Sequence, residues 1–164
     1  MTTALVRTRE ASESDVAAVL ELHGRCSAHS LEQRFHAPVA AISPRLARQL
    51  VSPPGGWSIV AEQGEEVVGH GCAGALSDTE VEVALIVDDA VHGSGIGSRL
   101  MRDLAHGAEQ RGFTSLVCAV EPDNESVLPT VRKAGLRPST SYVDGVLEIV
   151  VPLVPVAAED RQTA

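Results

Sequence analysis

A strand, a glycine-rich loop and a helix follow one another without interruption between Val81 and Arg111, and this succession constrains the fold most. Gly93, Gly95 and Gly97 carry no Cβ, so successive backbone N–H groups can close around an anion. In the segment after the loop, apolar residues recur at every fourth position, which is typical of one face of a helix. Because the N-terminus of this helix points into the loop, the segment predicts an anion site, most often one for phosphate.

Two common phosphate-binding loops do not fit these residues. A P-loop ends in Gly-Lys-Ser/Thr, but Gly97 is followed by Ser98 and Arg99, and the loop contains no lysine. A dinucleotide fingerprint needs a third glycine three positions after the second, where this chain has Ser98 or Leu100. A glycine run that only links a strand to a helix remains an alternative.

The loop residues His92-Gly-Ser-Gly-Ile-Gly97 fit the pattern Arg/Gln-x-x-Gly-x-Gly/Ala, which is the acetyl-CoA loop of the GNAT acyltransferase superfamily. The stretch from Glu82 to Asp88 resembles the fourth strand of that family. Asn124, with Gly135 in Arg-Lys-Ala-Gly-Leu, resembles its C-terminal Asn…Lys-x-Gly-Phe segment. The resemblance covers about residues 55–137. His92 departs from the usual Arg or Gln, which puts in doubt a side-chain contact to pyrophosphate but not the backbone cradle.

The order of local patterns agrees with this family. Alternating or continuous apolar runs predict strands at 5–7, 57–61, 67–73, 81–87, 115–120, 139–143 and 146–151. Helical spacing, caps and breakers predict helices at 16–23, 44–51, 96–111 and 126–134, the first of them entered through a capping box from Ser12 to Asp15. Residues 30–38 show no regular pattern. We therefore expect an α/β (α+β) fold with a single mixed, mostly antiparallel central sheet flanked by helices, and the resemblance implies a splay between the fourth and fifth strands.

Length and charge exclude several classes of protein. The 164 residues suit one domain, which we expect at 1–154, before a small, polar and disordered tail at 155–164. A formal net charge of −9 argues against nucleic-acid binding. No stretch approaches the roughly 18 consecutive apolar residues of a membrane span, and no apolar core follows the N-terminal residues. We expect a cytoplasmic protein without membrane contact, either a monomer or a homodimer.

Three cysteines do not suggest a disulfide framework in such a chain. Cys26 lies between His23 and His29 at three-residue spacing, which could place three metal ligands along a helix. No further ligand pair with zinc-like spacing accompanies them, so we expect no metal site. Cys72 and Cys118 lie in apolar strand-like runs and are expected to act as small core residues.

Acetyl transfer to an amine requires a proton acceptor, because an alkylamine with a pKa of about 10.4 is mostly protonated at neutral pH. Glu82 lies opposite the apolar face of its strand, beside Ala84 and Ile86, where we expect it to be partly desolvated. The resemblance implies Glu82 as the general base, as in many family members. Glu80 is the second candidate, and two simply outward-facing glutamates are the structural alternative.

The resemblance also implies how acetyl-CoA is held. Backbone groups of Leu85, Ile86 and Val87 would hold the pantetheine arm, with one amide serving the oxyanion. Asn124 would meet the pantetheine side, although it also suits a helix cap. The complete set of expected acetyl-CoA contacts is Leu85, Ile86, Val87, His92, Gly93, Ser94, Gly95, Ile96, Gly97, Ser98 and Asn124.

A second departure concerns the general acid. Many members carry a tyrosine at the position of Val131, and Tyr142, the only tyrosine of this chain, lies on a different element. A thiol with a pKa of about 8.5 is a tolerable leaving group, so departure as thiolate or protonation by water is expected.

The segment from Cys26 to Phe35 resembles the Ser-x-x-Ser-x-x-x-Arg-Phe segment of bacterial Pat-like protein lysine acetyltransferases. The resemblance implies that Arg34 and Phe35 lie near the acceptor entrance. The alternative is that Phe35 anchors a loop on the core while Arg34 pairs with a surface acid. A protein lysine is thus the expected acceptor and a small-molecule amine the second. A domain that senses acyl-CoA without catalysis, and an interaction module without CoA, are further alternatives.

Overall fold

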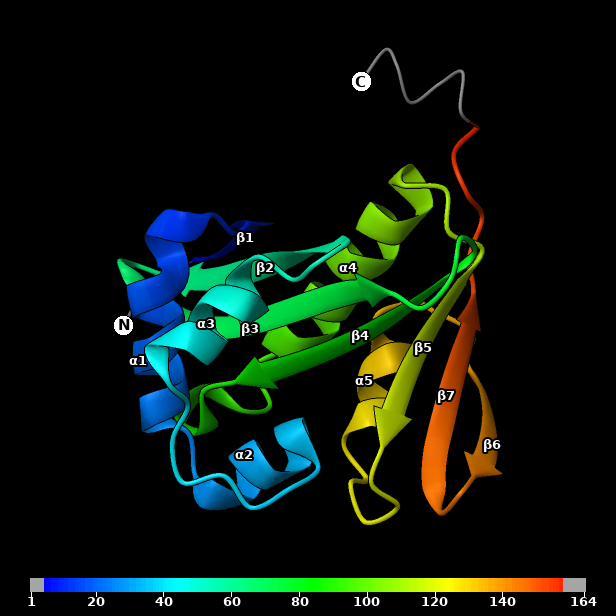
Figure 1. The fold of residues 1–164 in the computed structure, drawn as a ribbon. Coiled ribbons are helices and arrows are strands. Elements are labelled where there is room, and N and C mark those ends of the chain that lie inside the picture. Colours follow the sequence, from blue (N-terminus) through cyan, green and yellow to red (C-terminus); the bar gives the residue numbers. More distant parts are fainter. Residues whose placement is uncertain (1–4, 158–164) are drawn as a thin grey trace.

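Seven strands form one mixed sheet in the computed structural model, which describes residues 5–157 (Figure 1). Their spatial order is β1-β2-β3-β4-β5-β7-β6, and every neighbouring pair is antiparallel except β4 and β5. The expected mostly antiparallel α/β architecture is therefore confirmed. The strands are β1 (Val6–Glu10), β2 (Gly56–Gln63), β3 (Glu66–Ala75), β4 (Glu80–Val87), β5 (Ser115–Val120), β6 (Ser139–Val143) and β7 (Val146–Pro152).

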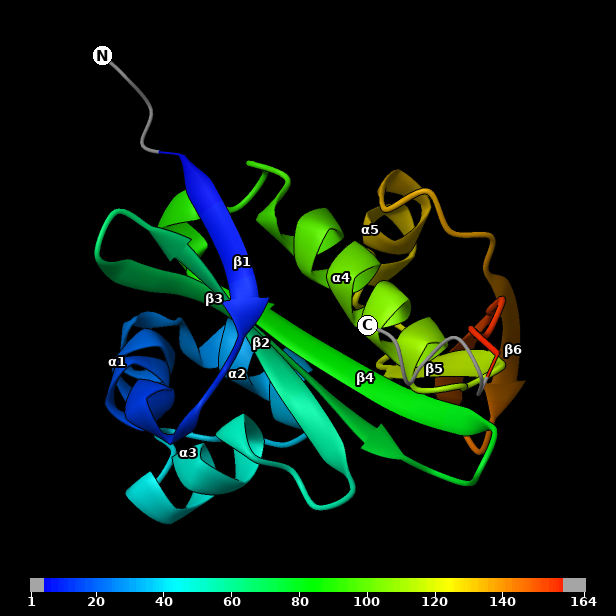
Figure 2. The ribbon, with the colours of Figure 1, turned by 90° about the horizontal axis from the view of Figure 1, so that it is seen from above.

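Helices cover both faces of the sheet (Figure 2). One face carries α4 (Ile96–Gln110) and α5 (Val127–Lys133), and the other carries α1 (Val16–Arg25), α2 (Ala28–Phe35) and α3 (Pro44–Val51). Two short 3-10 turns, η1 (Glu13–Asp15) and η2 (Asp89–Val91), precede α1 and the glycine loop. Among residues 5–157, no helix has the length and apolar character needed to span a membrane.

The two faces of β4 serve two separate cores, as the alternation of its residues predicts. Val81 and Val83 belong to the larger cluster, to which α4 contributes Leu100 and Leu104 and α5 contributes Val131. Ile86 faces the other way and packs in the smaller cluster under α1. Strand β4 is thereby held from both sides, and its position relative to the helices is rigidly defined.

Pairing between β4 and β5 ends early. It joins Glu80–Glu82 to Ser115–Val117, although β4 runs on to Val87 and β5 to Val120. The two strands diverge beyond this point, as Figure 1 shows. The splay implied by the family resemblance is present.

One helix was not expected from the sequence. Residues 28–35 form α2, capped by Ser27, whose hydroxyl accepts a hydrogen bond from the N–H of Ser30. The helix ends at His36, which adopts a left-handed conformation with a φ of 55°. Only Leu31 of this helix is buried, so the sequence contains no repeating apolar face that would predict it. Strand β1 also starts and ends later than the expected span at 5–7.

The expected domain boundary stays a prediction. Residues 158–164 of the expected tail lie outside the described residues. Val156, within the last described residues, donates its backbone N–H to the carbonyl of Glu109 at 2.8 Å.

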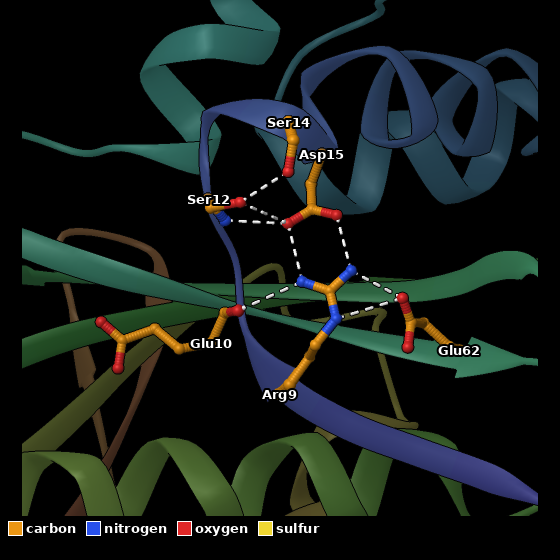
Figure 3. Close-up of polar contacts among 6 residues, drawn as sticks. All are labelled: Arg9, Glu10, Ser12, Ser14, Asp15 and Glu62. Carbon is orange, nitrogen blue, oxygen red and sulfur yellow. Dashed lines mark hydrogen bonds and ion pairs between the residues drawn. The ribbon is translucent and has the colours of Figure 1, made fainter.

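A charged network joins β1, β2 and the entrance of α1 (Figure 3). Arg9 donates two hydrogen bonds to the buried carboxylate of Asp15, at 2.8 and 2.7 Å, and two to Glu62, at 2.6 and 3.1 Å. The same carboxylate accepts the N–H of Ser12 at 2.8 Å, which is its part of the predicted capping box. The Arg9 contact holds the pKa of Asp15 below its ordinary value of 3.8.

Replacing Asp15 by Asn should lower the free energy of unfolding at pH 7 by about 2 kcal/mol, because Arg9 and Ser12 lose a charged acceptor. A carboxyl with a lowered folded-state pKa contributes stability above its unfolded pKa and loses it as pH falls through the folded value. The difference between wild type and variant should therefore shrink between pH 7 and pH 2 in urea unfolding. Asp78→Asn, in an exposed turn, is the control. A difference that stays constant with pH would contradict this role for Asp15.

Candidate active site

A cleft of about 300 Å³ opens where β4 and β5 separate. Its walls come from α2, the second half of β4, the glycine loop, the first turn of α4, the end of β5 and one face of α5. Residues distant in the sequence thus meet around a space that exists only because the two strands diverge.

The glycine loop has the backbone shape of an anion cradle. Gly93 and Gly95 have φ angles of 77° and 85°, in the left-handed region that residues with a Cβ adopt at a cost. Gly95 is the N-cap of α4, so the N–H groups of the following first turn have no acceptor within the helix. These amides and the positive end of a 15-residue helix face the cleft together. The loop therefore fits a pyrophosphate.

Side chains of the loop turn back onto its own backbone. The His92 ring Nε2 lies 2.8 Å from the carbonyl oxygen of Val87, and the Ser94 hydroxyl donates to the carbonyl of Val91. His92 still lines the cleft, whereas Ser94 does not. All the other residues expected to contact acetyl-CoA line the cleft as well. The loop is fastened by its side chains, which leaves its amides for a ligand.

The second half of β4 offers a free backbone edge. Leu85, Ile86 and Val87 pair with β3 on one side, opposite Gly71, His70 and Gly69. On the other side the pairing with β5 has already ended at Glu82. An extended amide-containing chain can add to such an edge by backbone hydrogen bonds, and the pantetheine arm is a chain of this kind.

Glu82 lies at the last paired position before the strands separate, and it is exposed. The structure thus differs from the expectation of a partly desolvated carboxylate, and Glu82 is not among the residues that line the cleft. Its charge nevertheless reaches the cleft wall: burial first, and the Glu82 carboxylate second, raise the pKa of the Cys118 thiol to about 12. Cys118 lines the cleft, so the charge of Glu82 acts on a residue of the cleft wall.

Asn124 was expected either to contact the pantetheine arm or to cap a helix, and its position is compatible with both roles. Its side-chain oxygen accepts hydrogen bonds from the N–H and the hydroxyl of Ser126, at 3.3 and 2.7 Å, before α5 begins. Asn124 also lines the cleft. Val131, at the position of the family's tyrosine, is fully buried in the larger core, and Tyr142 is 71% exposed on the edge strand β6. Neither residue lines the cleft.

Arg34 lines the cleft from α2, whereas Phe35 packs against the smaller core. The Arg34 guanidinium lies 4.9 Å from the centre of the Phe35 ring. Its Nη2 donates to the sulfur of Cys72 at 3.1 Å. The alternative reading of Phe35 as an anchor on the core thus agrees with the structure, while no carboxylate within residues 5–157 forms an ion pair with Arg34.

Two helix faces that line the cleft were not expected from the sequence. Residues three or four positions apart form each face, and this spacing is the only signal in the sequence that groups them. They are Ser30 and Gln33 on α2, on the same face as the expected Arg34, and Val127, Thr130 and Lys133 on α5. Lys133 adds a cation to the wall near the loop.

The residues weighed as metal ligands, His23, Cys26 and His29, do not gather into a set of three ligands within residues 5–157. His23 is buried and its Nδ1 donates to the carbonyl of Val19 at 2.7 Å. Burial raises the pKa of Cys26 to about 11, which disfavours the thiolate that binds metals. Across the described residues, no three His, Cys, Asp or Glu side chains gather closely enough to hold a metal ion.

Comparison with known proteins identifies the family. The sequence profile of the acetyltransferase (GNAT) family matches residues 17–136. The chain therefore belongs to the GNAT family and is an N-acetyltransferase. A comparison with curated protein sequences gives no match.

Solved structures share the fold at low sequence identity. The GNAT domain of S. lividans PAT superposes with a TM-score of 0.82 at 24% identity and covers 90% of each chain. yncA, a putative acetyltransferase from Salmonella typhimurium with its cofactor acetyl-CoA, has a TM-score of 0.70 at 19% identity, covering 93% of this chain and 96% of that one. The ribosomal-protein-S18-alanine N-acetyltransferase from Escherichia coli gives 0.67 at 17% identity, covering 95% and 98%.

Gly95→Ala should weaken CoA binding by about tenfold, because a Cβ disfavours the left-handed conformation by roughly 1–2 kcal/mol and displaces the loop amides. Titration calorimetry with CoA measures this. Gly24→Ala is the control, since Gly24 lies in α1 with open space around its Cβ position. Wild-type affinity in Gly95→Ala would show that the loop conformation does not hold the ligand.

Proposed function

We propose that this chain transfers the acetyl group of acetyl-CoA to a primary amine, foremost the side chain of a protein lysine, with Glu82 as general base. The observation that carries this proposal is the meeting of two backbone features in one cleft: the N–H groups before α4 and the free edge of β4. One suits a pyrophosphate and the other an extended pantetheine arm.

The chain's own groups would bind acetyl-CoA in consecutive parts. Amides of Gly95 to Ser98 receive the pyrophosphate, and the edge from Leu85 to Val87 receives the pantetheine amides. This arrangement directs the thioester toward the point where β4 and β5 part, beside Glu82. A β4 N–H at this edge is available to stabilise negative charge on the thioester oxygen.

The reaction needs an unprotonated amine at the thioester carbonyl. A C–N bond forms, the C–S bond breaks, and CoA leaves as thiolate, which is tolerable for a thiol with a pKa of about 8.5. Glu82 takes the proton that the amine loses, directly or through one water. Its exposure at the point where β4 and β5 separate suits contact with an acceptor that arrives from solvent.

Two observations support a protein lysine as the acceptor. The segment that ends in Arg34 and Phe35 resembles that of Pat-like enzymes, and it lies in α2 against the cleft. The fold agrees best, among the structures compared above, with the GNAT domain of S. lividans PAT. A small-molecule amine is the second candidate acceptor. A cytoplasmic location stays a prediction.

Acetyl-CoA should stabilise the protein by about 2.7 kcal/mol at one hundred times its dissociation constant. A thermal-shift titration with acetyl-CoA tests binding, and release of free CoA thiol in the presence of lysine-containing peptides tests transfer. Stabilisation without thiol release, in the presence of any amine, would indicate a sensor domain. No stabilisation would indicate an interaction module that does not use CoA.

Glu82→Gln should lower kcat at pH 7 by about 10²–10⁴-fold while acetyl-CoA still binds, because a proton acceptor is removed. The deficit should shrink as pH rises toward the amine pKa of about 10.4, where the acceptor deprotonates without help. Glu21→Gln, on the exposed side of α1, is the matched control. Unchanged turnover in Glu82→Gln would remove the assignment, and a loss in Glu80→Gln instead would transfer it to Glu80.

A further inference from the structure

Arg34 is a cation on the cleft wall whose protein contacts do not neutralise it. Its Nη2 donates to the sulfur of Cys72, a weak acceptor, and its guanidinium lies over the ring of Phe35. Its Nε is buried and has no hydrogen-bond partner among the described residues. A half-buried guanidinium with free donor capacity beside a cleft is suited to bind an anion.

The surroundings of Arg34 form a buried polar floor. His70 is completely buried and His23 is 1% exposed, and their ring centres lie 6.2 Å apart. Both ring nitrogens of His70 and the Nε2 of His23 have no partner within the described part of the chain. Unpaired polar atoms in the interior are uncommon, so the described residues around Arg34 offer no acceptor that neutralises its charge but retain unused hydrogen-bonding capacity.

Burial opposes a positive charge on both histidines. Burial, followed by the charge of Arg34, lowers the pKa of His70 to about 3, and the same two causes act against protonation of His23. Neutral rings can donate or accept hydrogen bonds without adding a second cation. Arg34 is thus the charged group of this floor.

The pairing of β3 with β4 shows how Arg34 lies relative to Glu82, the proposed base. Cys72, the contact of Arg34, pairs with Ala84 on β4, and Gly74 pairs with Glu82. Directly paired residues share a face of the sheet, so Arg34 and Glu82 serve the same face. Along β4, Ala84 and Glu82 are about 7 Å apart. An acceptor whose amine meets Glu82 therefore has room to direct a second group toward Arg34.

We propose that Arg34 binds a carboxylate of the acceptor, so that the enzyme prefers amines that carry an acidic group able to reach Arg34 while the nitrogen meets Glu82. This inference rests on the proposed function. The carboxylate belongs either to the main chain of a free amino acid or to an Asp or Glu side chain next to a peptide lysine. Both sources offer the same planar, bidentate partner to the guanidinium.

Two matched pairs of acceptors separate these sources. Nα-acetyl-lysine and its carboxamide differ only in the main-chain carboxylate, and acetyl-Glu-Lys-Ala-amide and acetyl-Ala-Lys-Ala-amide differ only in the neighbouring acid. Within at least one pair, wild-type kcat/KM should favour the acidic member by at least about tenfold. The preferred pair identifies the source.

Arg34→Gln should bring that ratio close to one, because kcat/KM falls more for the acidic member than for its neutral partner. Arg34→Lys, which keeps the charge but not the fork, should give an intermediate ratio. Arg45→Gln removes the same charge from the exposed side of α3 and should leave the ratio unchanged. A purely structural role of Arg34 predicts instead an equal loss for both members of a pair.

A measurement of acceptor binding tests this inference independently of catalysis. With CoA bound, the acidic member should raise the melting temperature of the wild type more than its neutral partner, and Arg34→Gln should abolish the difference. If no acceptor is acetylated but this difference is present, the proposed function fails and the carboxylate site stands. The inference would be overturned if the wild type had equal kcat/KM for both members of each pair and if both members raised its melting temperature equally.

Discussion

The early end of pairing between β4 and β5 is the constraint on which the rest of the site depends. The two strands pair only up to Glu82 and Val117, after which β5 continues its full pairing with β7 and β4 keeps its pairing with β3. A strand edge inside a protein leaves polar backbone groups that need partners. Because the loop after β4 leads directly into α4, that edge and the free amides of the helix open on one cleft. An extended ligand with an anionic part satisfies both.

A second set of contacts joins the start of α2, the helix that carries Arg34, to the residues that precede the glycine loop. Asp88 and Asp89 follow β4 directly, and they accept hydrogen bonds from Arg25 and from Ser27, at the junction of α1 and α2. Burial opposes the charge on both carboxylates, yet these hydrogen bonds hold the pKa of each below its ordinary value. The start of the anion loop and the helix that carries Arg34 are therefore fixed to each other.

The parts of the fold that consecutive residues encode could be predicted from the sequence. The glycine loop, α4 and the hairpin turn at Asp144-Gly145, where both residues have positive φ, carry their signals within a few positions. The helix α2 could not, because its stability comes from Leu31 against the core and from contacts of Ser27 with Asp89. Propensity and periodicity do not record such tertiary contacts.

The same distinction applies to the site. Except for Asn124, the expected cofactor residues come from the stretch 85–98, and all of them except Ser94 line the cleft together. The exposure of Glu82 depends on how β5 leaves β4, which no local pattern contains. The floor beneath Arg34 joins α1, α2 and β3 through His23 and His70, whose sequence positions carry no shared motif. Its polar character emerges only when the three elements pack.

His92 and Val131 depart from the family pattern, and in the proposed reaction neither side chain holds or protonates the acetyl donor. His92 hydrogen-bonds to the backbone of Val87 and steadies the loop, so contact with an anion falls to the amides of the first helical turn. Val131 is fully buried in the apolar core where many family members carry a tyrosine, so in the proposed reaction release of CoA depends on the acidity of its own thiol. In the proposed reaction, backbone groups hold the acetyl donor, and the side chains that remain for chemistry and selection, Glu82 and Arg34, act on the acceptor. Differences in activity between this chain and its relatives should then lie on the acceptor side of the cleft, where side chains rather than backbone decide.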